Sequence, residues 1–285
     1  MTKTLRFVKM QGCANDYIYI DCFRETVEDP SALAVKLSRR HFSVGADGVI
    51  LICPSEKADV RMRMFNADGS EGKMCGNGIR CVAKYAYDSG IARKEEISVE
   101  TLAGIKTIRV FVDERGKVAS ACVNMGRAIL QPKKIPALFD GKEAVNVPLT
   151  VLDETYQITA VSMGNPHAVT FVEPEFDLWH FDIEKIGPYF ENHVKFPERV
   201  NTEFVRVIDR THLEMRVWER GSGETYACGT GTCATVVAAC ENGLCDKNTD
   251  VTVRLLGGSL TIRYTDEAVF MTGPCEEVYR GETEL

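Results

Sequence analysis

The sequence lacks the features that would place it in several common classes. No apolar run approaches the roughly 18–20 residues that a membrane-spanning helix needs, and the first residues resemble a strand, not a signal peptide. Basic residues form no long stripe, and 34 Lys and Arg against 41 Asp and Glu give a net charge of −7. This charge argues against a nucleic-acid binder. We therefore expect a cytoplasmic protein that acts on a small molecule and contacts neither nucleic acid nor membrane.

Metal-binding pairs of cysteines are also missing, although the chain has eleven cysteines. Structural zinc sites favour a C-x2–4-C pair on a turn. Cys75 and Cys81 are spaced too widely for such a pair, and Cys228 and Cys233, like Cys75 and Cys81, run into a predicted helix instead of lying on a turn. A secreted disulfide framework would be a smaller and denser chain. We predict no metal site and expect most cysteines to be reduced, buried and inert.

Nucleotide-binding motifs are present only in weak form. Residues 229–234 fit G-x-G-x-x-A, a dinucleotide fingerprint when it follows a strand in an α/β unit. Here the motif lies late in the chain, in a half that is rich in strands. A P-loop is excluded at residues 69–73, because the spacing fails and Met74 stands where Ser or Thr is needed. We predict that the protein needs no cofactor.

What the chain does contain is a long internal repeat. Residues 62–78 and 215–231 share matched Met, Arg, Glu, Cys and Gly positions at one offset, 228 − 75 = 153. The offset persists downstream, where Gly257 matches Gly104. A duplicated half that keeps one cysteine in each copy predicts a site at which two thiols face one substrate.

Each copy is predicted to consist of strands and one long apolar helix. The two matched helices are expected at residues 76–87 and 229–240, each followed by a glycine that suits a helix C-terminus, Gly90 and Gly243. Shorter helices are expected at residues 30–40 and 181–190. The halves are predicted to meet near residues 126 and 127, ahead of a Pro-Lys-Lys linker.

The position of each key cysteine, at the start of a predicted helix, suggests its chemistry. The first N–H groups of a helix lack internal partners and carry the positive end of the helix dipole. We expect the thiolate form of Cys75 and of Cys228 to be favoured there. Two such helix starts would hold one carboxylate, while the thiols remove and return a proton on opposite faces of the adjacent carbon. A single cysteine before a helix would more often be a small buried residue.

The residues around both cysteines resemble the two signature segments of the diaminopimelate epimerase family. The first is N-A-D-G-S-E at 66–71 with M-C-G-N-G-I-R-C at 74–81, and the second is E-R-G at 219–221 with A-C-G-T-G at 227–231. Further matches are G-N-P-H at 164–167 and N-T-E-F-V at 201–205. The resemblance covers essentially the whole chain.

This resemblance implies an α+β fold of two pseudo-symmetric halves, each a barrel-like, mostly antiparallel sheet around a central helix. The active site would lie in the cleft between the halves. The halves would span residues 1–126 and 127–274, with a C-terminal strand in residues 275–285 returning to the first. The family interconverts LL- and meso-diaminopimelate, in lysine and cell-wall precursor biosynthesis, without pyridoxal phosphate. The family often forms homodimers.

The resemblance also assigns the site residues. Cys75 and Cys228 would be the catalytic acid/base pair, and His167 and Glu219 would tune the thiols. The substrate would be bound by Asn15, Asn66, Gly76, Asn77, Asn165, Asn201, Glu219, Arg220, Gly229 and Thr230. Arg220 suits a carboxylate at the distal end of the substrate. Gly48 departs from the family, because some members carry a substrate-contacting glutamine there.

Two other functions remain open at this point. The chain would be a racemase of another amino acid, such as proline, if the same fold held a smaller substrate. It would be a thiol redox or binding protein if the cysteines were not acid/base groups. Arg220 and three substrate asparagines favour a substrate with two amino-acid ends.

Overall fold

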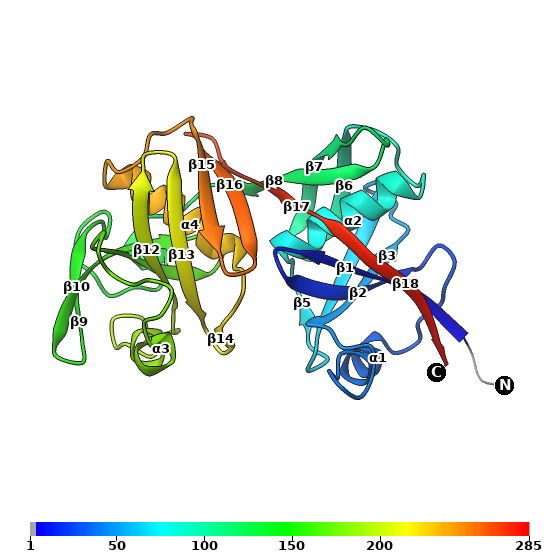
Figure 1. Cartoon of the computed structure of the whole chain (residues 1–285), viewed down its shortest axis with the longest axis horizontal. Coiled ribbons are helices and arrows are strands. Elements are labelled where there is room, and N and C mark those ends of the chain that lie inside the picture. The colour runs from blue at the N-terminus through cyan, green and yellow to red at the C-terminus, as the bar shows by residue number, and fades with distance from the viewer. Residues whose placement is uncertain (1–3, 285) are drawn as a thin grey trace. The chain divides into compact units, whose positions relative to one another are not determined.

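The computed structural model describes residues 4–284, which divide into two compact units. Unit 1 contains the chain up to Asn124 and again from Thr272, and unit 2 contains Met125–Met271. The chain leaves unit 1 near the end of strand β8 (Val118–Gly126) and re-enters it within β17 (Val269–Pro274). The two units are drawn in Figure 1.

Unit 1 consists of nine strands, counted with β8, and two helices. The strands are β1 (Thr4–Gly12), β2 (Asn15–Asp21), β3 (Gly48–Cys53), β4 (Val60–Asn66), β5 (Glu71–Gly72), β6 (Glu96–Thr101), β7 (Gly104–Val112), β8 and β18 (Glu276–Glu284). The helices are α1 (Pro30–Leu37) and α2 (Gly76–Asp88). β18 pairs with β1, so the last strand belongs to unit 1.

Unit 2 contains two helices, a short 3-10 helix and a second set of strands. The strands are β9 (Val147–Val151), β10 (Glu154–Ser162), β11 (Pro166–Val172), β12 (Asn201–Asp209), β13 (His212–Glu219), β14 (Gly223–Glu224), β15 (Asp250–Leu255) and β16 (Gly258–Tyr264). The helices are α3 (Ile183–Glu191), α4 (Gly229–Glu241) and the 3-10 helix η1 (Pro132–Lys134).

The two units repeat the same series of strand pairings. In unit 1 the pairs β1–β2, β3–β4 and β6–β7 are antiparallel, whereas β2–β3 and β4–β6 are parallel. In unit 2 the pairs β10–β11, β12–β13 and β15–β16 are antiparallel, whereas β11–β12 and β13–β15 are parallel. The predicted duplication and the predicted α+β fold are therefore confirmed, and each mostly antiparallel sheet contains two parallel steps.

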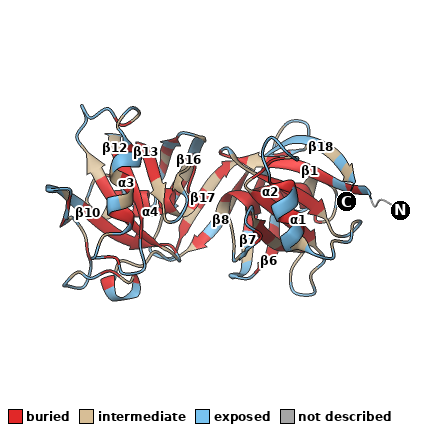
Figure 2. Cartoon of the chain, turned by 90° about the horizontal axis from the view of Figure 1, so that it is seen from below, coloured by how far each residue is buried: buried red, intermediate tan, exposed pale blue. Residues whose placement is uncertain are grey.

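The matched helices α2 and α4 are the central helices of their units. α2 packs against β1, β2, β4, β6 and β7, and α4 packs against β10, β11, β12 and β16. Both helices are buried along most of their length, as Figure 2 shows. Gly90 and Gly243 follow the two helices with φ of 81° and 72°, the left-handed conformation that glycine adopts most easily. Both predicted helices were correct to within one residue at each end.

The smaller helices begin at aspartate caps. The side chain of Asp29 accepts from the N–H of Ala32 at the start of α1, and that of Asp182 accepts from the N–H of Lys185 at the start of α3. Such caps satisfy N–H groups that have no partner inside the helix. α1 is shorter than predicted and ends at Leu37, and α3 begins two residues later than predicted.

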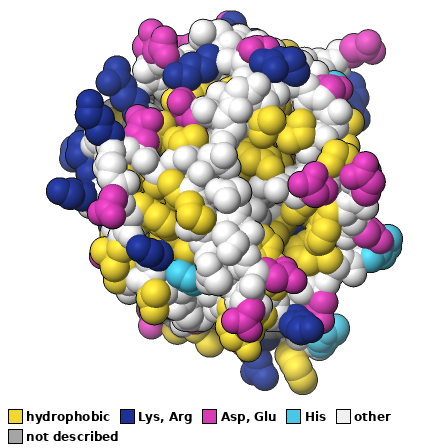
Figure 3. Space-filling view, turned by 90° about the vertical axis from the view of Figure 1, so that its left-hand side faces the viewer, with side chains coloured by type: hydrophobic (Ala, Val, Ile, Leu, Met, Phe, Trp, Pro, Cys, Tyr) yellow, Lys and Arg dark blue, Asp and Glu magenta, His cyan; other side chains and the backbone are white. Residues whose placement is uncertain are grey.

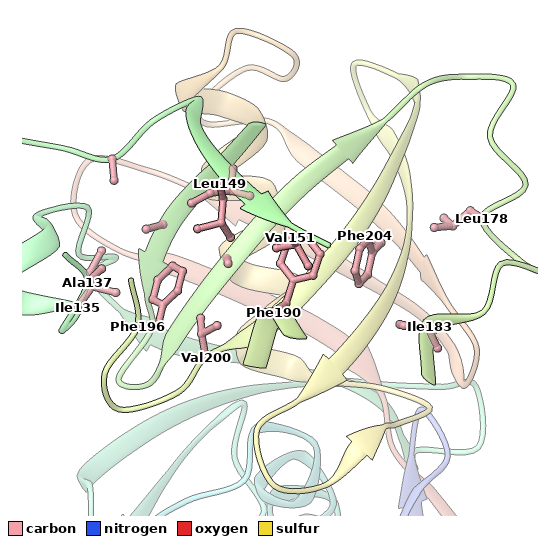
Figure 4. Packing of buried hydrophobic residues seen from close by; sticks show 14 residues of the cluster. Ile135, Ala137, Leu149, Val151, Leu178, Ile183, Phe190, Phe196, Val200 and Phe204 are labelled. Atoms are coloured by element: carbon pink, nitrogen blue, oxygen red, sulfur yellow. The ribbon is translucent and has the colours of Figure 1, made fainter. Parts of the chain in front are cut away.

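Aromatic rings form much of the hydrophobic core of unit 2 that packs against α3. Phe190 of α3 lies edge-on to Phe204 of β12 with ring centroids 5.3 Å apart, and Phe196 is 2% exposed beside them. Figure 4 shows these rings with Leu149 and Val151 of β9. α3 is therefore fixed to the sheet by a continuous apolar cluster.

The surface carries mixed charge, and no helix among residues 4–284 is long and apolar enough to cross a membrane. On the face drawn in Figure 3, Lys and Arg side chains lie among Asp and Glu side chains, with hydrophobic side chains between them.

Helix α3 packs closely against β13 and hydrogen-bonds to the turn after β13. A Cβ atom added at Gly187 would lie 2.3 Å from Cδ2 of Trp218. The indole Nε1 of Trp218 donates to the Glu191 carboxylate at 2.8 Å, and the N–H of Gly221 donates to the same carboxylate at 2.9 Å. α3 therefore holds the turn that contains the predicted substrate residues Glu219 and Arg220.

We predict that Gly187→Ala destabilises the protein, although alanine usually favours a helix. The added methyl group would overlap the Trp218 ring, and such overpacking costs about 1–3 kcal/mol. Urea denaturation followed by tryptophan fluorescence should show a lower midpoint. Glu184→Ala, at an exposed position of the same helix, is the control and should leave the midpoint nearly unchanged. Equal midpoints for the two variants would contradict the packing argument.

Candidate active site

Each of the two key cysteines is the N-cap residue of a central helix. Cys75 has extended backbone angles, φ −127° and ψ 120°, and its sulfur accepts from the N–H of Gly78 at 3.3 Å. Cys228 repeats this geometry with φ −115° and ψ 108°, and its sulfur accepts from the N–H of Gly231 at 3.3 Å. The side-chain sulfur occupies the position in which a serine or aspartate oxygen usually caps a helix.

The glycines that donate to the sulfurs have no room for a side chain. A Cβ atom on Gly78 would lie 2.7 Å from Cδ1 of Ile50, and one on Gly231 would lie 2.4 Å from Oε1 of Glu203. The absence of Cβ lets the strand behind each helix approach the first turn closely. Ile50 and Glu203 are therefore the side chains directly behind the two half-sites.

In unit 1, Cys75 is surrounded by neutral partners from β2. Its S–H donates to Oδ1 of Asn15 at 3.2 Å, and the Asn15 amide donates to Asp47 at 2.8 Å. The Tyr17 hydroxyl also hydrogen-bonds to the Cys75 sulfur. The Asp47 carboxylate therefore orients Asn15, and Asn15 orients the thiol.

In unit 2, Cys228 is surrounded by charged or titratable partners. Glu219 hydrogen-bonds to its sulfur, and the Thr230 hydroxyl lies 3.4 Å from it. His167 is fully buried, with Nδ1 2.7 Å from Glu203 and Nε2 3.0 Å from Oδ1 of Asn165. The charge of Glu203 acts on the Cys228 sulfur and so connects the His167 contacts with the Cys228 contacts.

Burial acts against the thiolate form that the sequence predicts. It raises the pKa of the Cys75 thiol, although the N–H groups of Gly78 and Asn77 lower it. Burial raises the pKa of Cys228 well above its ordinary value, and the carboxylates of Glu219 and Glu203 raise it further. The expectation of a favoured thiolate is therefore wrong for the protein without substrate, because loss of hydration outweighs the helix start.

Strand register explains why the two half-sites differ. Tyr17 pairs with Gly48 and Gly48 with Asn66 across β2, β3 and β4. In unit 2, His167 of β11 pairs with Asn201 of β12. Thr202 pairs with Trp218 of β13, so the neighbouring residue Asn201 lies opposite Glu219.

Unit 1 therefore presents tyrosine, glycine and asparagine where unit 2 presents histidine, asparagine and glutamate. Gly48 cannot carry a side chain here, because a Cβ atom would lie 2.1 Å from the Phe65 carbonyl oxygen. This position contributes backbone alone.

Glu219 and Arg220, the residues predicted to bind the distal end of a substrate, lie at the end of β13 and on the turn that follows it. Oδ1 of Asn201 accepts from the Arg220 N–H at 2.7 Å, and Oε1 of Glu219 accepts from the Thr225 hydroxyl at 2.5 Å. The Arg220 guanidinium donates to the Glu198 carbonyl at 2.8 Å, and the remaining guanidinium N–H groups stay available to a carboxylate.

The remaining predicted residues lie at the helix starts or at the end of a strand. Gly76 and Asn77 open α2, and Gly229 and Thr230 open α4. The Oδ1 atom of Asn77 is buried and has no hydrogen-bond partner in the described protein. Asn66 ends β4, and its amide donates to the Ser70 hydroxyl at 2.9 Å.

Sequence reasoning missed Tyr17, Asp47 and Glu203. Tyr17 lies two residues after Asn15 and so points to the same side of β2. Glu203 is the third residue of the N-T-E-F-V segment and points to the same side of β12 as Asn201. This two-residue spacing was the available signal. The contacts with the sulfurs depend on helix packing and were not visible in the sequence.

Comparison with solved structures defines the class of fold. A PhzF-family phenazine biosynthesis protein from Bacillus anthracis superposes with a TM-score of 0.72 at 18% identity, covering 99% of this chain and 100% of that one. A hydroxyproline epimerase from Agrobacterium vitis superposes with a TM-score of 0.69 at 14% identity, covering 100% and 92% of the two chains. The duplicated two-unit fold of this chain is the one found in these proteins.

Sequence relatives define the family. The diaminopimelate epimerase family model matches residues 7–130 and 159–278. Relatives named diaminopimelate epimerase include one from Acetivibrio thermocellus, 53% identical over 99% of both chains, and one from Desulfovibrio desulfuricans, 54% identical over 99% of both. A relative of the same name from Methanococcus maripaludis is 47% identical over 99% of this chain and all of its own. The chain belongs to the diaminopimelate epimerase family.

We predict that Glu203→Gln makes the Cys228 thiol ionise at lower pH. The amide keeps the shape of the carboxyl group but removes a negative charge that opposes thiolate formation. The rate of Cys228 alkylation by iodoacetamide, followed by peptide mass spectrometry, should rise at lower pH than in the wild type. At neutral pH the rate should increase several-fold.

The control for this experiment is Glu241→Gln at the far end of α4, which should leave the profile unchanged. An unchanged pH profile for Glu203→Gln itself would show that the Glu203 charge does not reach the sulfur.

Proposed function

We propose that this protein interconverts LL- and meso-diaminopimelate by proton transfer at the α-carbon, with Cys75 and Cys228 as the two acid/base groups and no cofactor. The observation that carries the proposal is the repeated cysteine cap, one at the start of each central helix. Membership of the diaminopimelate epimerase family supports the choice of substrate. We infer that the two thiols act on opposite faces of one carbon of the substrate.

The reaction we propose moves one proton at each face. The thiolate of one cysteine removes the α-proton, and the thiol of the other donates a proton to the opposite face. The product leaves with inverted configuration, and the two cysteines have exchanged protonation states. Because the reaction is reversible, each cysteine serves as base in one direction and as acid in the other.

Ionisation of the two thiols, of which Cys228 is buried and Cys75 partly buried, is the step that substrate has to assist. Burial disfavours either thiolate in the free protein. A bound substrate brings an ammonium group, whose positive charge favours a nearby thiolate. We infer that the thiolate is formed mainly with substrate in place, where it is desolvated and strongly basic.

The helix starts would hold the reacting carboxylate. The first-turn N–H groups at Gly76, Asn77, Gly229 and Thr230 carry the partial positive charge of each helix. As the α-proton leaves, negative charge moves onto the carboxylate oxygens, and donors already aimed at that position stabilise it. This removes the need for a metal ion or for pyridoxal phosphate as an electron acceptor.

The rest of the substrate would be recognised in part by unit 2. Arg220 offers its free guanidinium N–H groups to the distal carboxylate, and Glu219 suits an ammonium group. Asn15, Asn66, Asn165 and Asn201 would complete the hydrogen bonds. His167 and Glu219 would also tune the Cys228 thiol.

The cellular setting is a further proposal. The family resemblance supports a cytoplasmic enzyme of lysine and cell-wall precursor biosynthesis that assembles as a homodimer. Size-exclusion chromatography with light scattering tests the assembly, because a monomeric mass at the concentration of the assay would contradict it.

We predict that Cys75→Ala and Cys228→Ala each lower kcat for diaminopimelate epimerisation at least about a hundredfold, because each removes one of two positioned acid/base groups. The assays are conversion of LL- to meso-diaminopimelate, followed by chiral chromatography, and deuterium incorporation at the α-carbon in D2O under reducing conditions, followed by mass spectrometry. Cys240→Ser is the control, because Cys240 lies near the far end of α4, and it should retain wild-type activity. Normal turnover by either alanine variant would overturn the two-cysteine mechanism.

We predict that the enzyme prefers substrates with a second amino-acid end over substrates with only one. In the same deuterium assay, diaminopimelate should exchange at least about tenfold faster than proline, which cannot reach Arg220. Arg220→Lys should raise KM for diaminopimelate, because a lysine cannot form the bidentate pair. Faster exchange with proline would instead support a racemase of another amino acid. No exchange with any amino acid would favour a thiol redox or binding protein.

A further inference from the structure

A second pair of cysteines lies away from the helix starts, at the far end of β2 and β3. These strands are parallel, and their last register pair is Asp21 with Ile52. The N–H of Cys22 donates to the Ile52 carbonyl at 2.9 Å, which continues the parallel ladder by one step. Cys22 and Cys53 are therefore opposite each other on neighbouring strands, and their side chains point to the same side.

The two thiols are in contact. The Cys22 and Cys53 side chains hydrogen-bond to each other. Neighbouring strands lie about 4.8 Å apart, and disulfides join Cα atoms that are about 4.4–6.8 Å apart. The usual spacing of neighbouring strands thus falls within the range of Cα separations that disulfides join.

The surroundings of the pair favour one thiolate. The hydrogen bond from Cys22 lowers the pKa of Cys53, and the cations Arg63 and Arg61 lower it as well. Arg61 is the register partner of Cys53 on β4. The pKa of Cys22 is raised by the same hydrogen bond and by burial. Both residues remain partly exposed at the edge of the apolar cluster under α1, so a small molecule can reach them.

A second pair of interacting cysteines, in unit 2, has different thiol pKa values. Cys240 and Cys245 interact electrostatically at the end of α4, but burial raises their pKa values to about 12 and about 11. Neither thiol is favoured as the thiolate. An arginine alone does not change this, because Arg210 lowers the pKa of Cys245 without offsetting burial. The hydrogen bond from Cys22, together with Arg63 and Arg61, therefore distinguishes the first pair.

We propose that Cys22 and Cys53 form a reactive dithiol site that is oxidised to an intramolecular disulfide by low-molecular-weight disulfides of the glutathione type. The site is separate from the cysteine caps of α2 and α4 and does not depend on the proposed epimerase activity.

The reaction has two exchange steps. The Cys53 thiolate attacks one sulfur of the small disulfide, a mixed disulfide forms, and one small thiolate leaves. Cys22 then loses its proton and attacks the Cys53 sulfur, the internal disulfide forms, and the second small thiolate leaves. Two electrons pass from the protein to the small disulfide, and the two released thiolates take up two protons. A partly exposed disulfide of this kind is readily reduced again by a dithiol.

The test uses the full-length protein incubated with oxidised glutathione at neutral pH and then digested for mass spectrometry. We expect a Cys22–Cys53 linked peptide that dithiothreitol removes. Cys22→Ser should instead trap glutathione on Cys53, because the resolving thiol is gone. Cys53→Ser should slow modification at Cys22 about tenfold or more, because the favoured thiolate is lost. Arg63→Gln should slow formation of the bridge several-fold.

Cys122→Ser is the matched control, because Cys122 is also partly exposed in unit 1 but lies on β8. It should form the Cys22–Cys53 bridge at the wild-type rate. A lasting mixed disulfide on Cys53 in the wild type would overturn the proposal, as would modification of Cys53 no faster than of Cys122. Bridges confined to other cysteines would also overturn it. Deuterium exchange measured on the same samples reports the epimerase proposal separately.

Discussion

The N–H groups at the first turn of a helix need acceptors, and in α2 and α4 one acceptor is a cysteine sulfur. This one hydrogen bond fixes the sulfur at the tip of the helix, next to the remaining N–H groups that would receive a carboxylate. It also requires glycine at 78 and 231, because the strand behind each helix leaves no space for a side chain. The sheets around α2 and α4 hold those helices, and thereby the sulfurs, in place.

The two halves share a backbone plan but not an electrostatic environment. Behind Gly78 stands the apolar side chain of Ile50, whereas behind Gly231 stands the carboxyl group of Glu203, held by His167. A symmetric reaction at one carbon needs two similar thiols, but the remainder of a two-ended substrate is not symmetric. Duplication supplied two equal sulfurs, and divergence at the neighbouring register positions made their surroundings unequal. The carboxylates of Glu219 and Glu203 act directly on the Cys228 sulfur, whereas the Asp47 carboxylate is bound to the amide of Asn15.

The sequence allowed the parts of this structure that depend on local pattern to be predicted. The constant offset located α2 and α4 to within a residue, and Gly90 and Gly243 marked their ends. The state of the thiols was predicted wrongly, because desolvation depends on how strands close over the helix start. The position of Glu203 behind the Cys228 half-site was not predicted for the same reason, because its neighbours His167 and Gly231 come from β11 and α4. Strands β5 and β14, two residues each, are too short to show any periodicity.

The pairing of β1 with β18 has a consequence for how the protein is made. A ribosome releases β1 long before β18, so the first sheet cannot gain that strand until the chain has been made as far as Glu276–Glu284. Unit 2 is one continuous segment, Met125–Met271, and all of its strands emerge earlier. The second half is therefore able to fold before the first half is complete, which reverses the usual N-terminal-first order. Until then β1 presents an unpaired edge that chaperones or neighbouring nascent chains can occupy.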